Sequence, residues 1–226
     1  MTTAHPIVLE AGWVTETLAV HARRTEPQPT RPSDDHLPGC GHEVVALDVA
    51  VYAAIAATPT PTLDRIFTAV SRAADHSKLW TATAAALALV GGRHGRRAAV
   101  NGIASIALAS TVVNVVLKPL GRRRRPDRAA HAVPLARQVA MPLTTSFPSG
   151  HAASAFAFAT GVTRELPTVG IPAHGAAAVV AYSRVHTGVH YPLDVIVGAV
   201  VGGALSPVAT TWLDRRRARR SRRNAR

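Results

Sequence analysis

Uncharged, mostly apolar runs alternate with short polar segments along most of the chain. The two longest, 98–117 and 195–213, can each cross a hydrocarbon layer of about 30 Å at about 1.5 Å per helical residue. Shorter runs lie at 49–63, 79–92, 152–163 and 166–183. Alone, such short runs are typical of buried helices in a soluble bundle. Together with the long runs, they predict an all-α, integral membrane helical bundle with about five or six transmembrane helices.

The segment between the runs 49–63 and 79–92 has a different pattern. Its apolar residues recur at helical spacing among charged ones: Leu63, Ile66, Phe67 and Val70 against Asp64, Arg65 and Arg72. This pattern predicts an amphipathic helix that lies on the bilayer surface or caps the bundle. A surface helix of a soluble domain is the alternative interpretation.

The N-terminal part of the chain lacks long apolar runs. It is rich in proline at 27–38, and it has no basic stretch followed by a continuous apolar core, so it does not resemble a cleaved signal peptide. We expect a mobile N-terminal segment at 1–42, a membrane domain at 43–213 and a basic tail at 214–226.

Positive charge is concentrated at the C-terminal end. The 226 residues carry a formal net charge of +13, and the segment 214–226 holds eight arginines and one aspartate. A basic block directly after an apolar helix is typical of a cytoplasmic segment that contacts anionic lipid headgroups. Nucleic-acid binding is disfavoured because no aromatic side chains interleave with the arginines, as a stacking platform requires.

The basic residues also predict the orientation in the membrane. The predicted loop 91–97, with the sequence GGRHGRR, lies on the same side as the tail if all later runs cross the bilayer. The positive-inside rule makes this side cytoplasmic and makes the chain a multi-pass protein of the cell membrane. Three polar loops then face outward. Trp80 and Trp212, near the ends of two runs, suit positions at the membrane interface.

The first outward loop is strongly basic. Lys118 and Arg125 bracket a turn closed by Pro126. A mobile ammonium and a planar guanidinium suit the oxygens of a phosphoryl group. The three arginines between them suit contacts with lipid headgroups: Arg122, Arg123 and Arg124.

The second outward loop contains the tetrapeptide Pro-Ser-Gly-His at 148–151. Pro148 suits the first turn of a helix, where the backbone N–H groups of Ser149 and Gly150 favour an anion. His151 follows at the edge of the expected pocket, where it can give a proton to a leaving oxygen.

The third outward loop has the sequence YSRVHTGVHYPLD at 182–194. Pro192 starts the last long helix and places Asp194 in its first turn, four residues after His190. A carboxylate near an imidazole fixes its tautomer and leaves the other ring nitrogen free to act as a nucleophile. Arg184, at the end of the preceding helix, adds a second guanidinium for phosphate.

Three other interpretations of this loop remain open. His186, His190 and Asp194 could bind a metal on a continuous helix, but Gly188 and Pro192 disfavour that continuity. Cys40 is the only cysteine, which excludes an intramolecular disulfide and a thiolate metal cluster. A triad of Ser149, His190 and Asp194 would need an oxyanion hole rather than several guanidiniums. The polar residues could also simply seal helix ends.

Together the loops resemble the three signature motifs of the type 2 phosphatidic acid phosphatase superfamily, in order and without a gap or substitution. The matching residues are Lys118 and Arg125-Pro126 after six residues, Pro148-Ser149-Gly150-His151, and Ser183-Arg184 followed by His190 and Asp194. The resemblance spans roughly 43–213.

This resemblance implies an enzyme that hydrolyses a phosphomonoester or diphosphate of a membrane lipid on the extracytoplasmic side, without a metal or other cofactor. It implies that His190 forms a phosphohistidine, that Asp194 orients His190, and that His151 protonates the departing lipid alcohol. It also implies that five residues hold the phosphoryl oxygens: Lys118, Arg125, Ser149, Gly150 and Arg184.

Two rival functions share these motifs or this architecture. Vanadium-dependent haloperoxidases have a similar pocket but are soluble, whereas this chain has two long apolar runs. A non-catalytic lipid-binding or transport protein would be favoured by loss of the nucleophile or the acid, and both histidines are present. The small size, composition and topology favour a polyprenyl-linked substrate of cell-envelope synthesis, such as decaprenyl phosphoribose phosphate or undecaprenyl diphosphate. Phosphatidylglycerophosphate and phosphatidic acid are the alternatives.

Overall fold

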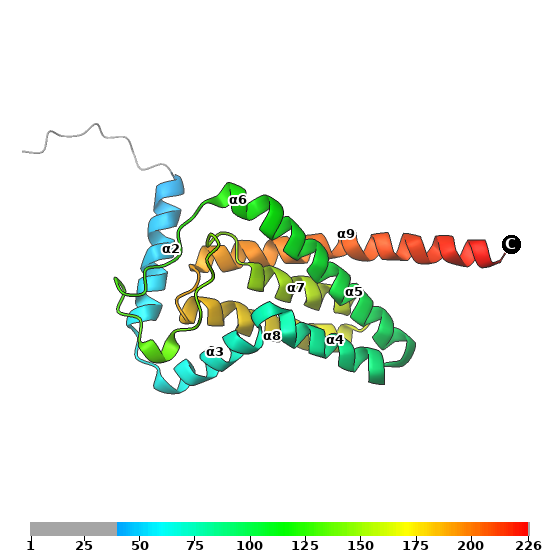
Figure 1. Ribbon diagram of the computed structural model, residues 1–226, viewed down its shortest axis with the longest axis horizontal. Helices are drawn as coiled ribbons and strands as arrows, with labels where there is room; N and C mark the ends of the chain where they lie inside the picture. Colours follow the sequence, from blue (N-terminus) through cyan, green and yellow to red (C-terminus); the bar gives the residue numbers. More distant parts are fainter. Residues whose placement is uncertain (1–39, 226) are drawn as a thin grey trace, which may run out of the picture. The chain divides into compact units, whose positions relative to one another are not determined.

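The computed structural model describes residues 40–225, and these residues form helices and loops without a β-strand (Figure 1). The all-α prediction is therefore confirmed for the described chain. The expected mobile segment 1–42 lies outside these residues, except at its end. Residues 40–42 already belong to the first described helix, because Cys40 begins α2 (Cys40–Ala57).

The apolar runs expected from the pattern are helical, except that the run 49–63 is broken at residues 58–60. After α2 the helices are α3 (Pro61–Ala73), α4 (Lys78–Val90), α5 (Gly92–Thr111), α6 (Lys118–Gly121), α7 (Gly150–Thr163), α8 (Pro167–His186) and α9 (Pro192–Asn224). Short helical turns lie at Asp75–Ser77 and Leu135–Arg137, and the backbone of α5 widens into a π-helical turn at Val112–Leu117 before α6.

Two continuous helical stretches are long and apolar enough to cross a membrane, Gly92–Gly121 and Pro192–Asn224. A third candidate is the pair formed by Gly41–Ala57 and Pro61–Ala73, which is bent by 117° at its break. The remaining helices are too short or too polar to qualify by length and composition alone. The number of transmembrane helices therefore stays a prediction.

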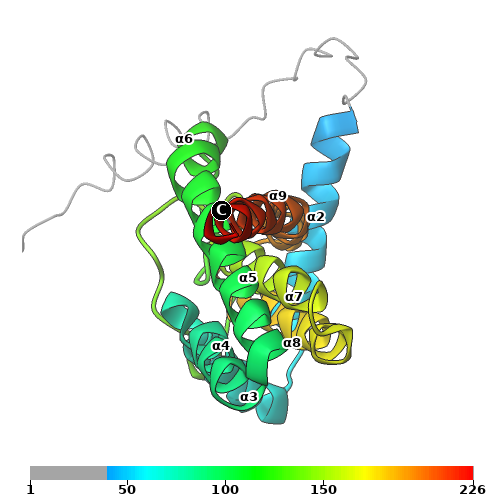
Figure 2. The ribbon, with the colours of Figure 1, turned by 90° about the vertical axis from the view of Figure 1, so that its right-hand side faces the viewer.

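Helix α7 lies at the centre of the bundle. It packs against α5, α8 and α9, and α5 also packs against α4 and α9. Figure 2, viewed toward the C-terminal end of α9, shows α5 and α7 beside that helix. Most residues of α7 are buried, and many are alanine, which lets the neighbouring backbones approach closely.

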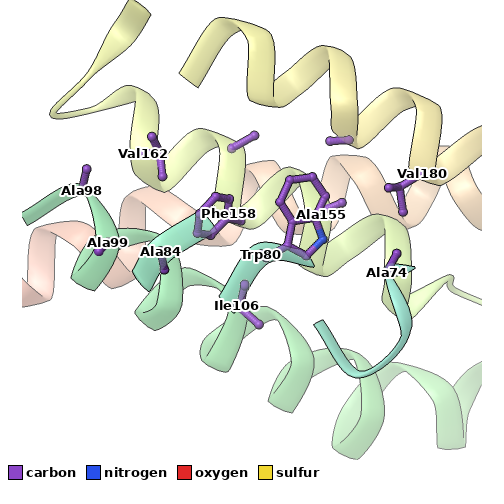
Figure 3. Packing of buried hydrophobic residues seen from close by; sticks show 12 residues of the cluster. Ala74, Trp80, Ala84, Ala98, Ala99, Ile106, Ala155, Phe158, Val162 and Val180 are labelled. Carbon is purple, nitrogen blue, oxygen red and sulfur yellow. The ribbon is translucent and has the colours of Figure 1, made fainter. Parts of the chain in front are cut away.

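Trp80 lies in the core rather than at an interface, which corrects the expectation for this residue. Its side chain is 3% exposed and packs against Phe158, with ring centroids 5.3 Å apart (Figure 3). The large ring fills the space that small residues leave, among them Ala84 and Ala155. Trp212 is half exposed, and the Arg216 guanidinium lies 3.8 Å from its ring centre, as suits an interfacial position.

Helix α3 is amphipathic as predicted, but three of its polar residues face the protein, while Arg65 and Arg72 are exposed. Asp64, Thr68 and Ser71 are buried, whereas Leu63 and Ile66 are 42% and 50% exposed. Outward apolar residues suit a helix that lies in lipid, because the bilayer covers them in place of the protein core.

The two basic segments are helical rather than irregular, and this corrects one predicted loop. The basic segment 91–97 is not a loop, because α5 already begins at Gly92, and only the turn at Gly91 and Gly92 separates it from α4. The segment 214–226 is helical as far as Asn224, since α9 continues from Pro192, and its role as a separate basic tail stays a prediction. Arginine is a good helix former, so a run of arginines extends an apolar helix instead of ending it.

The contact between α7 and α9 depends on two glycines of α9. A Cβ atom at Gly198 would lie 2.4 Å from the Ser149 carbonyl oxygen, and one at Gly202 would lie 2.1 Å from the Ala153 carbonyl oxygen. Both distances are far inside van der Waals contact. Glycine at these positions lets the two helices approach closely near the polar loops.

We predict that Gly202→Ala destabilises the protein by about 1 to 3 kcal/mol, because the added methyl group pushes α9 away from α7. Gly203→Ala is the matched control, since its Cβ meets only the Thr160 hydroxyl at 3.9 Å. That variant should be neutral or stabilised by up to about 1 kcal/mol through helix propensity. Thermal unfolding in detergent measures both, and equal midpoints for the two variants would contradict the close contact.

Candidate active site

A cavity of about 580 Å³ opens where the start of α7, the end of α5, His190 just before α9 and the loop after α6 meet. Its other walls come from the turn Asp75–Ser77 and from Ala140, Met141 and Pro142. Five of the eight predicted site residues line it: Lys118, Arg125, Gly150, His151 and His190. The other three are buried outside its lining: Ser149, Arg184 and Asp194.

His190 has a fixed ring orientation. Its Nδ1 lies 3.5 Å from Asp194 Oδ2 and 3.4 Å from the Ser146 hydroxyl, which itself donates to the same carboxylate. Nε2 lies on the side of Arg125, 3.3 Å from Nη1. Burial lowers the pKa of His190 to about 4, so the imidazole is neutral at neutral pH and one ring nitrogen keeps its lone pair.

The Asp194 carboxylate is held from several directions. The Tyr191 backbone N–H donates to Oδ2 at 2.9 Å, and Arg123 donates to Oδ1 at 2.9 Å. Arg123 also donates to Asp48 of α2 at 2.6 Å, and Asp48 in turn accepts the Leu193 N–H at 2.7 Å. This network joins α2, the basic loop and the start of α9 behind the histidine.

Arg123 therefore does not serve as the headgroup contact that the sequence suggested. It is half-buried between two carboxylates, whereas its neighbours Arg122 and Arg124 are exposed and keep that interpretation open. The middle arginine of the run thus faces the protein, and its two neighbours face outward. No local sequence signal distinguishes the middle residue, but the lone carboxylate of Asp48 beside an apolar run was a sign of a buried partner.

Thr144 holds both cations of the first motif. The Lys118 ammonium donates to its hydroxyl at 3.1 Å, and Arg125 Nε donates to its carbonyl at 2.8 Å. Arg125 Nη1 also donates to the Val189 carbonyl at 3.0 Å. These contacts place two positive charges at the cavity wall without neutralising them, so the charges remain available to an anion.

The second motif forms the start of α7, with Ser149 as its N-cap. The backbone N–H of Ser149 donates to the Asp194 carbonyl at 2.8 Å, which corrects the expectation that this amide faces an anion. Its hydroxyl accepts from the Ala152 N–H at 3.5 Å and keeps its own proton for another acceptor. Gly150 lies beside Lys118, whose Nζ would be 3.9 Å from a Cβ at this position.

His151 and Arg184 share one carboxylate that the sequence did not single out. Asp75 Oδ1 lies 3.0 Å from His151 Nε2 and 3.4 Å from Arg184 Nη1. Arg184 also donates to the Ser71 hydroxyl at 2.6 Å, while its buried Nε has no hydrogen-bond partner among the described residues. The polar sequence Asp-His-Ser-Lys at 75–78 between two helices was the available signal.

His186 points away from this site. Its Nε2 lies 2.9 Å from Asp64 on α3, and Asp64 also accepts from Arg137 at 2.7 Å. His186, His190 and Asp194 therefore do not surround a common point, and no group of three His, Cys, Asp or Glu within 40–225 is arranged to hold a metal ion. Ser149 makes no hydrogen bond to His190, which also disfavours the serine triad.

A family model for the PAP2 superfamily matches residues 98–218, which include all three motif loops. The chain belongs to the PAP2 superfamily. The resemblance stated from the motifs is thus confirmed. The chain is 37% identical over 154 residues to a decaprenylphosphoryl-5-phosphoribose phosphatase of Mycolicibacterium smegmatis. This match covers 68% of this chain and 79% of that protein. A phosphatase of the same name from Mycobacterium tuberculosis is 39% identical over 106 residues, covering 45% and 54%.

Solved structures agree with this assignment. Aquifex aeolicus LpxE superposes with a TM-score of 0.59 at 28% identity, covering 73% of this chain and 95% of that one. A transmembrane PAP2-type phosphatidylglycerolphosphate phosphatase of Bacillus subtilis superposes with a TM-score of 0.58 at 24% identity, covering 76% and 87%, which concerns the fold alone. The family model, the relatives and the solved structures together confirm the predictions of an integral membrane helical bundle and of a lipid phosphate phosphatase.

We predict that Arg123→Gln lowers kcat by about 10- to 100-fold, because it removes a hydrogen bond between charged groups worth about 1.5 to 3 kcal/mol and leaves Asp194 less well held. Arg124→Gln, the same change on an exposed neighbour, should retain wild-type activity. Phosphate release from a lipid phosphate in detergent measures both. Equal losses in the two variants would show that only the charge of the loop matters.

Proposed function

We propose that this enzyme removes the terminal phosphate of a polyprenyl-linked phosphate of cell-envelope synthesis, with decaprenylphosphoryl-5-phosphoribose as the first candidate. The support for this substrate is the name shared by the two mycobacterial relatives at 37% and 39% identity. The support for phosphate chemistry is the cavity, where Lys118 and Arg125 lie beside two histidines.

One observation carries the proposed mechanism. His190 has Nδ1 held by Asp194 and Ser146, so Nε2 is the nitrogen that faces the cavity and Arg125. A neutral imidazole fixed in this way is an oriented nucleophile. Nε2 attacks phosphorus and forms a P–N bond while the P–O bond to the lipid alcohol breaks.

The leaving oxygen takes a proton from His151, which becomes neutral. Water then attacks the phosphohistidine, His151 accepts a proton from that water, and the P–N bond breaks to release inorganic phosphate. Both histidines return to their starting protonation states. The phosphoryl charge is stabilised by the groups around the cavity: Lys118, Arg125, Gly150, the Ser149 hydroxyl and Arg184.

Arg184 contributes through its buried Nε. This N–H has no acceptor among the described residues, and a phosphoryl oxygen would satisfy it. Because guanidinium and ammonium groups stabilise the equatorial oxygens here, a task that metal ions perform in other phosphatases, we expect the reaction to need no metal.

The proposed site faces the outside of the cell membrane, and the basic end of α9 lies in the cytoplasm. The support is the charge asymmetry: Arg219, Arg220, Arg222 and Arg223 are exposed near the end of α9. This end would contact anionic lipid headgroups. It is also tied to the bundle, since Arg217 donates to Asn101 at 3.2 Å.

The function is tested by phosphate release from decaprenylphosphoryl-5-phosphoribose, phosphatidylglycerophosphate and phosphatidic acid. We expect the first to be hydrolysed fastest, with activity unchanged by EDTA and inhibited by vanadate. His190→Ala should abolish turnover and the trapped phosphoenzyme, whereas His186→Ala should keep the phosphoenzyme trapped by an alkaline quench, in which the P–N bond of phosphohistidine is stable. Restoration of activity by a divalent metal after chelation, or near-normal turnover of His190→Ala, would exclude the phosphohistidine mechanism.

Topology is tested with single cysteines on a Cys40→Ser background. Leu143 is fully exposed in the loop beside the cavity, and Ser221 is exposed near the end of α9. An impermeant thiol reagent added to intact cells should label Leu143→Cys and not Ser221→Cys, which should react only after permeabilisation. The reverse pattern would place the site in the cytoplasm.

A further inference from the structure

Asp75 connects the two parts of the site that handle the leaving group and the phosphate. It lies in the helical turn Asp75–Ser77 between α3 and α4 and lines the cavity. Oδ1 is 3.0 Å from His151 Nε2 and 3.4 Å from Arg184 Nη1. One carboxylate oxygen therefore contacts both the acid and a phosphate-binding guanidinium.

The charged groups that face His151 are otherwise basic. Burial and then four basic groups lower the pKa of His151 to about 2: Arg184 of α8, His190 just before α9, Lys118 of α6 and Arg125 of the loop after α6. Like charges disfavour a protonated imidazole, yet the leaving oxygen needs a proton from His151. Within residues 40–225, Asp75 is the only carboxylate in contact with this ring.

The backbone holds Asp75 in place. His76 and Ser77 both adopt left-handed backbone conformations, with φ of 55° and 56°, at the junction between α3 and α4. Two successive non-glycine residues of this kind are strained and persist only where the surroundings enforce them. Ala74, the preceding residue, is 2% exposed in the core and anchors the turn.

Ser71 of α3 holds Arg184, the guanidinium that also contacts Asp75. The Arg184 Nη1 that contacts Asp75 also donates to the Ser71 hydroxyl at 2.6 Å. Both acceptors belong to α3 or to the turn that follows it. The geometry of the acid thus depends on the inward polar face of the amphipathic helix.

We propose that Asp75 is the positioning residue of the general acid: it accepts the Nε2–H of His151, stabilises the protonated ring and leaves Nδ1 to deliver the proton. This inference deepens the proposed function and rests on it. Nδ1 of His151 makes no hydrogen bond to any described residue, whereas Nε2 is occupied by Asp75. A carboxylate that binds one ring nitrogen fixes the tautomer in which the other exchanges protons.

The proton balance follows directly. The imidazolium gives its Nδ1 proton to the leaving oxygen as the P–O bond breaks, and the neutral ring keeps its Nε2–H on Asp75. During hydrolysis of the phosphohistidine, Nδ1 takes a proton from the attacking water. Asp75 stays ionised throughout and gains no proton.

Asp75→Asn tests the charge while keeping the shape of the side chain. On dodecyl phosphate, whose alkoxide is a poor leaving group, kcat should fall on the order of 100-fold, as loss of a general acid does. On p-nitrophenyl phosphate, whose phenolate leaves without a proton, the loss should stay below about 5-fold. Asp127→Asn, the same change on an exposed carboxylate, should keep wild-type rates on both.

Two further measurements separate positioning from a structural role. In a His151→Ala background, Asp75→Asn should cost nothing more on dodecyl phosphate, because both changes remove the same function. In the single variant, kcat on dodecyl phosphate should begin to fall at a lower pH than in the wild type, since the ring loses its proton more easily without the carboxylate.

Equal losses on both substrates with weaker inhibition by vanadate would show that Asp75 acts only through Arg184. A full additional loss in the His151→Ala background would also overturn the inference. Asp75→Glu, which keeps the charge, is measured alongside, and failure of both variants to fold would make Asp75 a structural residue. If the wild type released phosphate from neither substrate, the proposed function itself would fail.

Discussion

The site depends on one backbone hydrogen bond, from the Ser149 N–H to the Asp194 carbonyl at 2.8 Å. It joins the N-terminal ends of α7 and α9, so the loops that carry His151 and His190 open into the same cavity. The bond requires close backbones, and Gly198 allows this because a Cβ there would lie 2.4 Å from the Ser149 carbonyl. A buried amide with such a partner also avoids the cost of an unsatisfied donor.

Each of the two histidines is paired with a different carboxylate. Asp194 contacts Nδ1 of His190, and Asp75 contacts Nε2 of His151. The first pair is deeply buried and its ring is neutral, which suits a nucleophile. The second pair lines the cavity among basic groups, where burial and then the nearby Arg184 lower the pKa of His151 to about 2, a shift that the contact with the Asp75 carboxylate opposes. The two pairs therefore differ in the ring nitrogen that the carboxylate contacts, Nδ1 in His190 and Nε2 in His151.

Buried charge in this region is balanced by pairing between distant elements. Arg123 lies between Asp48 and Asp194, and Arg137 contacts Asp64, which also binds His186. Removing one partner of such a pair is costly because the other charge stays buried. The first network joins α2 to the start of α9 behind His190, and the second joins α3 to the loop before α7 and to the end of α8, away from the cavity. Helix α3 therefore combines exposed apolar residues, such as Leu63 and Ile66, with buried polar residues, of which Ser71 contacts Arg184.

The sequence by itself determined most of the helices, the three motifs and five of the residues that line the cavity. Apolar runs predict helices because burial in lipid or protein needs uncharged side chains. The motif residues are polar and lie beside these runs, which indicates that they have a function. Sequence spacing also predicted the pairing of His190 with Asp194, since four residues separate them at a helix start.

Only the tertiary structure decided which other polar residues join the site. Asp75 is 76 positions from His151, and Asp48 is 75 from Arg123, so their contacts depend on how helices pack rather than on local spacing. The same reason explains why the position of Trp80 was predicted wrongly. Its place at the end of a run suggested the membrane interface, but it packs against Phe158 in the core. Arg122, Arg123 and Arg124 are chemically identical in the sequence. Their different environments arise only when the loop is folded against α2 and α9, because burial and pairing are properties of the packed chain.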